Sequence, residues 1–215
     1  MPAPRNWRQH RDELRALYDV DTEFEALEES CIPSYLHGNA LAARFAWQRL
    51  AAAVDHYSRL APAGPVLDFG AGSGVLARLL PAATPYHYVE QDDALAARIA
   101  ALVTGGRREH TASLPPTHFA AVFALDSLEH NEDVSALLAA LAATLRPDGV
   151  LILSGPTENL LYRLGRWVAG FSGHYHHQTI YDIEAVAAGG FRRVRLASLP
   201  LRFAPLFRVT AWRCA

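Results

Sequence analysis

The stretch VLDFGAGSGVL at residues 66–76 constrains the fold more than any other part of the sequence. A short apolar run leads into three glycines at alternate positions, and apolar residues follow. This order predicts a buried strand, a tight turn and the start of a helix, which is how α/β proteins commonly cradle a nucleotide-like cofactor. The surrounding chain is therefore expected to supply a sheet for this strand to join.

After residue 61, short apolar runs alternate with alanine- and leucine-rich segments. This alternation predicts a doubly wound α/β fold, with a mostly parallel sheet covered by helices on both faces. Two late apolar runs are separated only by LPLRFAP and predict an antiparallel hairpin at the sheet edge. The expected strands are 66–69, 86–90, 108–111, 121–125, 150–154, 194–199 and 207–212, and the expected helices are 74–81, 92–103, 133–145 and 180–188.

Residues 1–60 differ from the rest because they are polar and helical in pattern. Apolar residues fall close to one helical face over 40–59, and Asn39 is a suitable N-cap, so an amphipathic helix is expected there. A chain of 215 residues suits one well-packed domain with a short extension. We therefore expect an N-terminal helical cap at 1–60 over a main domain at 61–215.

Charge and composition exclude several classes of function. The net charge is −2, which gives no sign of the broad positive field that binds a phosphate backbone, so no nucleic-acid partner is expected. All basic residues are arginine, and the absence of lysine excludes Schiff-base and pyridoxal chemistry as well as a P-loop.

The cysteines and the N-terminus indicate a cytoplasmic location. Cys31 and Cys214 lie near opposite ends of the chain and form neither a metal-ligand spacing nor a disulfide framework. The N-terminus is polar, and no apolar run approaches the ~20 residues of a membrane span. The sequence does not indicate an oligomeric state.

Two carboxylates indicate the kind of ligand that the glycine turn would hold. Val75 occupies the position of the third glycine of a dinucleotide fingerprint, and Asp68 would repel phosphates and attract a cationic group such as an ammonium. Glu90, at the end of the next expected strand, is placed to accept hydrogen bonds from both hydroxyls of a ribose. The pattern therefore favours a ligand with a ribose and an ammonium and without phosphate.

S-adenosylmethionine has these groups, and the chain resembles the class I S-adenosylmethionine-dependent methyltransferases. The resemblance runs from about residue 66 to the C-terminus through VLDFGAGSG, YVE, FAAVFALDSLEHNED, LRPDGVLILSGP and AGGF. It implies a Rossmann-like seven-stranded sheet whose last strand is antiparallel. It also implies S-adenosylmethionine as the cofactor and methyl transfer to an oxygen or nitrogen of a small-molecule acceptor.

The resemblance also implies a set of cofactor-binding residues. The turn would hold the methionine part, Glu90 the ribose and the loop from His110 to Leu114 the adenine. The sequence departs from the family in this loop, where His110 occupies the place of an aspartate that many members use for adenine. The expected cofactor-binding residues are Asp68, Gly70, Ala71, Gly72, Glu90, Gln91, Ser113, Leu114 and Asp126.

Methyl transfer from a sulfonium is an in-line displacement, so the protein mainly has to align the reacting groups. A hydroxyl or ammonium acceptor must also lose a proton, and a neutral histidine is a suitable base at pH 7. His130 follows the fourth expected strand in DSLEHNED, at the edge where open α/β sheets bind ligands. The alternative reading of this segment is helix capping by Asn131 with flanking acids. His130 and His176 are the candidate catalytic residues.

The loop GHYHHQ at 173–178 carries three histidines. No cysteine or carboxylate accompanies them at ligand spacing, so no metal site is expected. His174 and His177 are candidate substrate contacts, and the resemblance adds Tyr35, just before the long N-terminal helix. The preceding stretch, 159–171, mixes apolar residues with arginine, which suits a lid over a pocket for a hydrophobic substrate or, as the less favoured alternative, a helix at a membrane surface.

Two other functions remain open at this point. One is a protein that binds S-adenosylmethionine or a partner without transferring a methyl group, because the family's adenine aspartate is missing. The other, less favoured, is an NAD(P)-dependent oxidoreductase, which would have to accept Asp68 and Val75 beside pyrophosphate.

Overall fold

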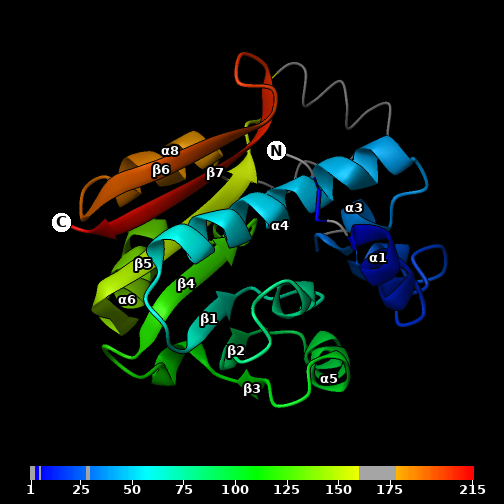
Figure 1. Cartoon of the computed structure of the whole chain (residues 1–215), viewed down its shortest axis with the longest axis horizontal. Helices are drawn as coiled ribbons and strands as arrows, with labels where there is room; N and C mark the ends of the chain where they lie inside the picture. Colours follow the sequence, from blue (N-terminus) through cyan, green and yellow to red (C-terminus); the bar gives the residue numbers. More distant parts are fainter. Residues whose placement is uncertain (1–2, 5, 28–29, 160–177) are drawn as a thin grey trace.

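The computed structural model describes residues 3–4, 6–27, 30–159 and 178–215, and these form a seven-stranded sheet with helices on both faces (Figure 1). The strand order is β3-β2-β1-β4-β5-β7-β6. All pairs from β3 to β5 are parallel, whereas β7 runs antiparallel to both β5 and β6. The strands are β1 Val66–Phe69, β2 Tyr86–Val89, β3 Arg107–Arg108, β4 Phe119–Leu125, β5 Leu145–Pro156, β6 Phe191–Pro200 and β7 Pro205–Cys214. The predicted sheet and its antiparallel final strand are confirmed.

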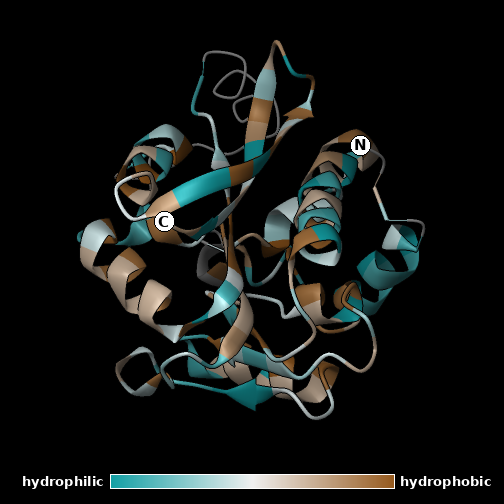
Figure 2. Ribbon diagram, turned by 60° about the vertical axis from the view of Figure 1, so that its left-hand side comes forward, coloured by the Kyte–Doolittle hydropathy of each residue, from teal (hydrophilic) through white to brown (hydrophobic). Residues whose placement is uncertain are grey.

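The helices divide between the two faces of the sheet, as Figure 2 shows from the side. Each face of the sheet has its own hydrophobic core. The helices of the N-terminal segment and α5 pack in one of these cores, and α6 and α8 pack in the other. The α-helices are α1 Trp7–Arg15, α2 Phe24–Leu27, α3 Ile32–Leu36, α4 Ala40–Leu60, α5 Asp93–Leu102, α6 Val134–Thr144 and α8 Ile180–Ala187, and three short 3-10 helices are η1 Val75–Arg78, η2 Thr111–Ser113 and η3 Leu128–His130.

Alternating side chains of the central strands fill these two cores. In β4, Phe123 packs on the face covered by α4 and α5, while Val122 and Ala124 pack on the face covered by α6 and α8. All three are almost completely buried. The continuous apolar strands of the sequence therefore reflect a sheet buried on both sides.

Two expected elements are shorter in the structure. The helix expected at 74–81 is only the 3-10 helix η1, which begins after Gly74 in a left-handed conformation and is followed closely by Pro81. The strand expected at 108–111 is the short β3, because Thr111 already belongs to η2. The long N-terminal helix agrees with its prediction, since Asn39 caps α4 by accepting hydrogen bonds from Leu41 and Ala42.

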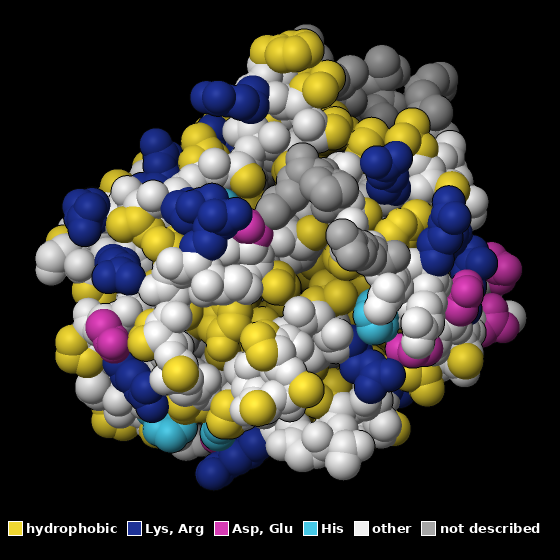
Figure 3. All heavy atoms as spheres, viewed as in Figure 1, with side chains coloured by type: hydrophobic (Ala, Val, Ile, Leu, Met, Phe, Trp, Pro, Cys, Tyr) yellow, Lys and Arg dark blue, Asp and Glu magenta, His cyan; other side chains and the backbone are white. Residues whose placement is uncertain are grey.

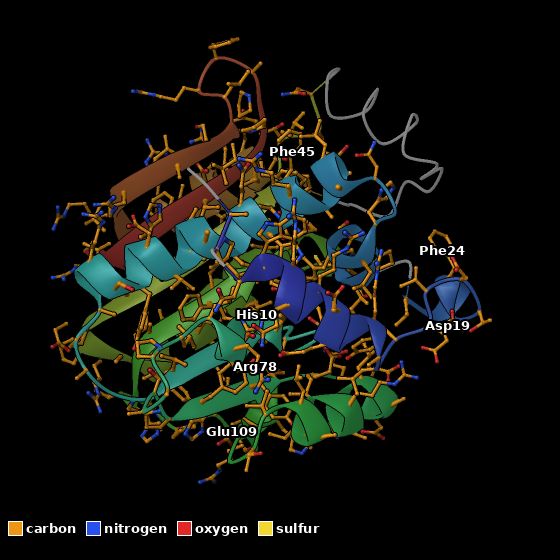
Figure 4. The ribbon with its side chains drawn as sticks, turned by 45° about the vertical axis from the view of Figure 1, so that its right-hand side comes forward. His10, Asp19, Phe24, Phe45, Arg78 and Glu109 are labelled. Atoms are coloured by element: carbon orange, nitrogen blue, oxygen red, sulfur yellow. The ribbon has the colours of Figure 1, made fainter. Side chains whose placement is uncertain are left out.

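The N-terminal segment shares its core with the sheet. Trp47 and Leu50 of α4 are buried in the same cluster as the strand residues Val150 and Ile152. Earlier in the same segment, α1 lies beside η1. Figure 4 shows Arg78 of η1 close to the part of α1 that carries His10. The division into a cap at 1–60 and a main domain at 61–215 stays a prediction.

Within the described residues, none of the helices is both long enough and apolar enough to cross a membrane. Figure 3 shows a hollow near the middle of one face, with hydrophobic side chains at its base and arginines and acidic residues around it.

Candidate active site

A cavity of about 380 Å³ opens at the carboxyl ends of β1, β2 and β4, where open α/β sheets bind their ligands. The glycine turn, Asp68 and Glu90 form one part of its wall, which we call the cofactor side. Tyr35 of α3, Asp126 after β4 and His130 of η3 line another part, which we call the acceptor side. The cavity thus brings together residues that are far apart in the sequence.

The backbone of the glycine turn allows the close approach that the sequence predicted. Gly70 and Gly72 both have positive φ values, 72° and 54°. A Cβ atom on Gly70 would lie 2.5 Å from Cβ of Ser127, so only glycine fits where the turn meets the segment after β4. Gly72 has no such neighbour, and its amide donates a hydrogen bond to Glu90 at 2.8 Å.

Asp68 is the buried carboxylate of the cofactor side. Its side chain accepts a hydrogen bond of 2.6 Å from the Tyr86 hydroxyl, and the residue is 3% exposed. Burial raises the pKa of Asp68 to about 7, with a smaller opposing effect from the Tyr86 hydroxyl. The carboxylate would therefore be stabilised by a cationic ligand group placed in the cavity.

Glu90 ties the turn to the next helix. One carboxylate oxygen accepts from the Gly72 amide at 2.8 Å, and the other accepts from the Asp92 amide at 3.0 Å. Asp92 is in turn the N-cap of α5. Each carboxylate oxygen has a further lone pair, so Glu90 can fix the turn and still accept hydrogen bonds from a ribose.

The acceptor side contains an ion pair that crosses from the N-terminal segment to the sheet. Arg49 of α4 contacts Asp126 at 2.7 Å, and both side chains are almost fully buried. Asp126 has a φ of 52°, and one of its oxygens also accepts from Ser154 at 3.2 Å and, weakly, from the Cys31 thiol at 3.7 Å. The Arg49 guanidinium lies 4.4 Å from the centre of the Phe207 ring. The negative charge of Asp126 is therefore compensated within the protein.

Glu129 is a second buried acid beside this pair, with 1% of its surface exposed. Burial raises the pKa of Glu129, and the charge of Asp126 raises it further. Burial likewise raises the pKa of the Cys31 thiol to about 12, so this cysteine is protonated at neutral pH.

The structure brings most of the described candidates together, with two exceptions. Ser113 and Leu114 are absent from the residues that line the cavity, and Leu114 packs instead against the core on the α6 and α8 face. His174, His176 and His177 lie outside the described residues, so their roles stay predictions. The predicted residues that line the cavity are Asp68, Gly70, Ala71, Gly72, Glu90, Gln91, Asp126, Tyr35 and His130.

The alternative interpretation of residues 126–133, in which Asn131 caps the following helix, is wrong about the capping residue. Asp133, and not Asn131, caps α6 by accepting a hydrogen bond from Ala136 at 2.9 Å. Asn131 follows η3, donates to the Ser127 carbonyl and lines the cavity. His130 is exposed at the cavity, where a ligand can reach it.

Arg49 and Tyr86 are functional candidates that the sequence reasoning missed. Arg49 could not be paired with Asp126 by spacing, because the contact depends on how α4 packs against the sheet. A signal for Tyr86 did exist: β2 and β1 pair in parallel with Tyr88 opposite Asp68, so Tyr86 and Asp68 project to the same face. Among the described residues, no group of three or more histidine, cysteine or acidic side chains is arranged to hold a metal ion.

Comparison with solved structures shows the fold. Magnesium protoporphyrin IX methyltransferase (ChlM) from Synechocystis, with bound S-adenosylhomocysteine, is 22% identical with a TM-score of 0.65, covering 91% of this chain and 100% of that one. The N-methyltransferase NodS from Bradyrhizobium japonicum, also with S-adenosylhomocysteine, is 13% identical with a TM-score of 0.67, covering 89% and 97%. The PH0226 protein from Pyrococcus horikoshii is 16% identical with a TM-score of 0.68, covering 89% and 99%.

Comparison with curated protein sequences gave no match. The family described as "Methyltransferase domain" matches residues 42–195, which include the cofactor side and most of α4. The matched region is more than half of the chain, and it contains the glycine turn and strands β1 to β5. The chain therefore belongs to this methyltransferase-domain family, and it shares its fold with methyltransferases solved with bound S-adenosylhomocysteine.

Proposed function

We propose that this enzyme transfers the methyl group of S-adenosylmethionine to an oxygen or nitrogen of a small, partly hydrophobic molecule. The observation that carries the proposal is the shared cavity, which has Asp68 and Glu90 on the cofactor side and His130 on the acceptor side. The absence of a basic surface excess, with a net charge of −2, argues against a nucleic-acid acceptor. A cytoplasmic location and a cap formed by residues 1–60 belong to the same proposal.

The residues of the cofactor side fit the groups of S-adenosylmethionine. Asp68 is buried, so its ionised carboxylate is stabilised when a cation lies beside it. The ammonium of the methionine part is such a cation. Glu90 can accept from the ribose, and the open space at Gly72 leaves the backbone of the turn accessible to close approach. When bound, the cofactor supplies a methyl group activated by the positive charge on sulfur.

The protein's own contribution is alignment and proton removal. The cavity places the acceptor side next to the glycine turn, and such positioning accounts for up to ~7–11 kcal/mol of a barrier. His130 takes the proton from an acceptor hydroxyl or ammonium, an effect of about 10²–10⁴-fold in rate. Tyr35 and Leu50 provide an apolar wall for the acceptor.

Calorimetric titration with S-adenosylmethionine, S-adenosylhomocysteine and NAD tests the cofactor. We expect micromolar binding of the first two and none of NAD. Replacing Asp68 or Glu90 with alanine should weaken binding about 10- to 100-fold, since each removes hydrogen bonds to a charged group. Asp93→Ala is the matched control, because Asp93 is a neighbouring exposed acid outside the cavity lining. Binding of NAD alone would reject the proposal.

Single-turnover assays on a panel of phenols, carboxylates and amines test the acceptor. With any acceptor that is methylated, His130→Gln should slow transfer by about 10²-fold or more while leaving cofactor affinity unchanged. His176→Gln, measured in parallel, tests the second predicted base. Cofactor binding without transfer to any member of the panel would favour the alternative, a protein that binds S-adenosylmethionine without catalysis.

A further inference from the structure

Tyr86 lies under the cofactor side and is the hydrogen-bond donor to Asp68 that the structure reveals. It is the first residue of β2, it is 5% exposed, and its hydroxyl lies 2.6 Å from Oδ2 of Asp68. A buried hydroxyl that donates to a buried carboxylate at this distance fixes the orientation of the carboxylate. Tyr88, two residues later, stacks on Tyr86 with ring centres 6.0 Å apart, but its hydroxyl donates to the Ala96 carbonyl.

The other charged and titratable groups around Asp68 are acids or phenols. Glu90 at the end of β2 acts on it through its negative charge, Tyr35 faces it from α3, and Asp126 lines the same cavity after β4. Among the described residues, no arginine or histidine forms an ion pair with Asp68, whereas Arg49 pairs with Asp126. The Tyr86 hydroxyl is thus the group beside Asp68 that favours its ionised form.

We propose that Tyr86 is a positioning residue for the cofactor, which keeps Asp68 ionised and oriented toward the ammonium of S-adenosylmethionine. This inference rests on the proposed function, in which Asp68 receives that ammonium. It adds a residue outside the glycine turn, and outside the residues that line the cavity, to the machinery that recognises the methionine part.

The hydrogen bond from Tyr86 to Asp68 affects how cofactor binding depends on pH. Burial raises the pKa of Asp68 to about 7, so the free protein is partly protonated there at neutral pH. A cationic ligand favours the ionised form, and its binding near pH 6.5 should therefore release a proton. Without the Tyr86 hydroxyl, the pKa of Asp68 would rise further, because the opposing hydrogen bond is lost.

The test is the affinity for S-adenosylmethionine between pH 5.5 and 9, measured by calorimetry on the parent protein and on Tyr86→Phe. The parent should lose affinity as the pH falls below about 7. In Tyr86→Phe, this loss should begin about one pH unit higher, so affinity at pH 6.5 falls about eightfold and largely recovers by pH 8.5. The ligand's own amino group titrates identically in both proteins, so it cancels in the comparison.

Tyr88→Phe is the matched control, since it removes a hydroxyl from the same face of the same strand without touching Asp68. It should leave the pH profile within about threefold of the parent. Asp68→Asn should abolish the acidic loss of affinity, and titrations in buffers of different ionisation enthalpy should show the released proton in the parent and not in Asp68→Asn. This proton count keeps the inference testable even if Tyr86→Phe folds poorly.

The outcomes separate the two proposals. If the parent does not bind S-adenosylmethionine at any pH, the proposed function fails. If the parent binds with the expected acidic loss but Tyr86→Phe shows an unmoved profile, or weakens equally at every pH, Tyr86 has only a packing role and the inference is rejected.

Discussion

Two buried aspartates line the same cavity, and they differ in the side chain that is paired with each carboxylate. Asp68, in β1, is paired with the neutral hydroxyl of Tyr86, whereas Asp126, just after β4, is paired with the guanidinium of Arg49. A neutral donor orients a carboxylate but leaves its charge to be met by a ligand, while an arginine compensates the charge directly.

This difference assigns the two residues different roles in one wall. Asp68 is expected to bind the ligand cation, and burial keeps its charge costly until that cation arrives. Asp126 connects the sheet to α4 through its ion pair with Arg49. Asp126 was predicted from its position to bind the cofactor, and the structure gives it an additional, internal partner.

The largest expected effect comes from breaking the compensated pair. Arg49→Met leaves Asp126 buried without its cation, beside the already buried Glu129, and should lower the free energy of unfolding by about 3–5 kcal/mol. Urea denaturation measures this as a lower midpoint at an unchanged slope. Arg49→Met combined with Asp126→Asn should recover part of the loss, because the stranded charge is also removed.

Arg59 provides the matched control on the same helix. It pairs with Asp55 at 2.8 Å, but its side chain is 60% exposed, so Arg59→Met should cost less than about 1 kcal/mol. Equal losses for Arg49→Met and Arg59→Met would show that burial of the Asp126 pair does not distinguish it, and the comparison of the two aspartates would fail.

The sequence predicted what depends on local pattern. The glycine turn with Asp68 beside it, the long helix with its Asn39 cap and the terminal hairpin all follow from periodicity, turn residues and family spacing. Glu90 was placed correctly because the end of a parallel strand lies at the ligand-binding edge whatever the register. Positions fixed by backbone conformation were therefore accessible from the sequence.

The partners of these residues were not accessible, because they depend on packing between distant elements. Arg49 reads as one more arginine of an amphipathic helix until α4 is placed on the sheet. Leu114 is a second case: family spacing predicted contact with adenine, which stays a prediction, and in the structure the side chain packs against the core on the α6 and α8 face. In both cases, the orientation of a side chain was decided by tertiary contacts that no local pattern encodes.

Glu129 gives a smaller effect that depends on pH. Its pKa is raised by burial and by Asp126, so ionising it in the folded protein costs stability, and this cost grows as the pH rises through the raised pKa. Glu129→Gln does not ionise. Relative to the parent, its stability should rise by on the order of 2 kcal/mol or more as the pH goes from about 4 to about 8, and it should change no further above the raised pKa.

Unfolding by urea at several pH values measures the Glu129 effect, with Glu132→Gln as the control because Glu132 is an exposed acid nearby. The stability difference for the control should not change with pH. If the stability difference between Glu129→Gln and the parent does not depend on pH, Arg49 compensates the charges of Asp126 and Glu129 together. Asp126 would then no longer be the distinct partner of Arg49.

The smallest effect is expected at an ion pair whose side chains are exposed to water. Arg98 of α5 holds Glu23, before α2, through two contacts of 2.6 and 2.9 Å, but about a third of each side chain is exposed. Because exposed pairs are screened, Glu23→Gln should lower the melting temperature by no more than about 2 °C, and added salt should erase the difference. Thermal unfolding at low and high salt measures this shift. A loss as large as that of Arg49→Met, insensitive to salt, would show that contact geometry outweighs burial in this protein. The contrast between Asp68 and Asp126 would then need an explanation other than how each charge is compensated.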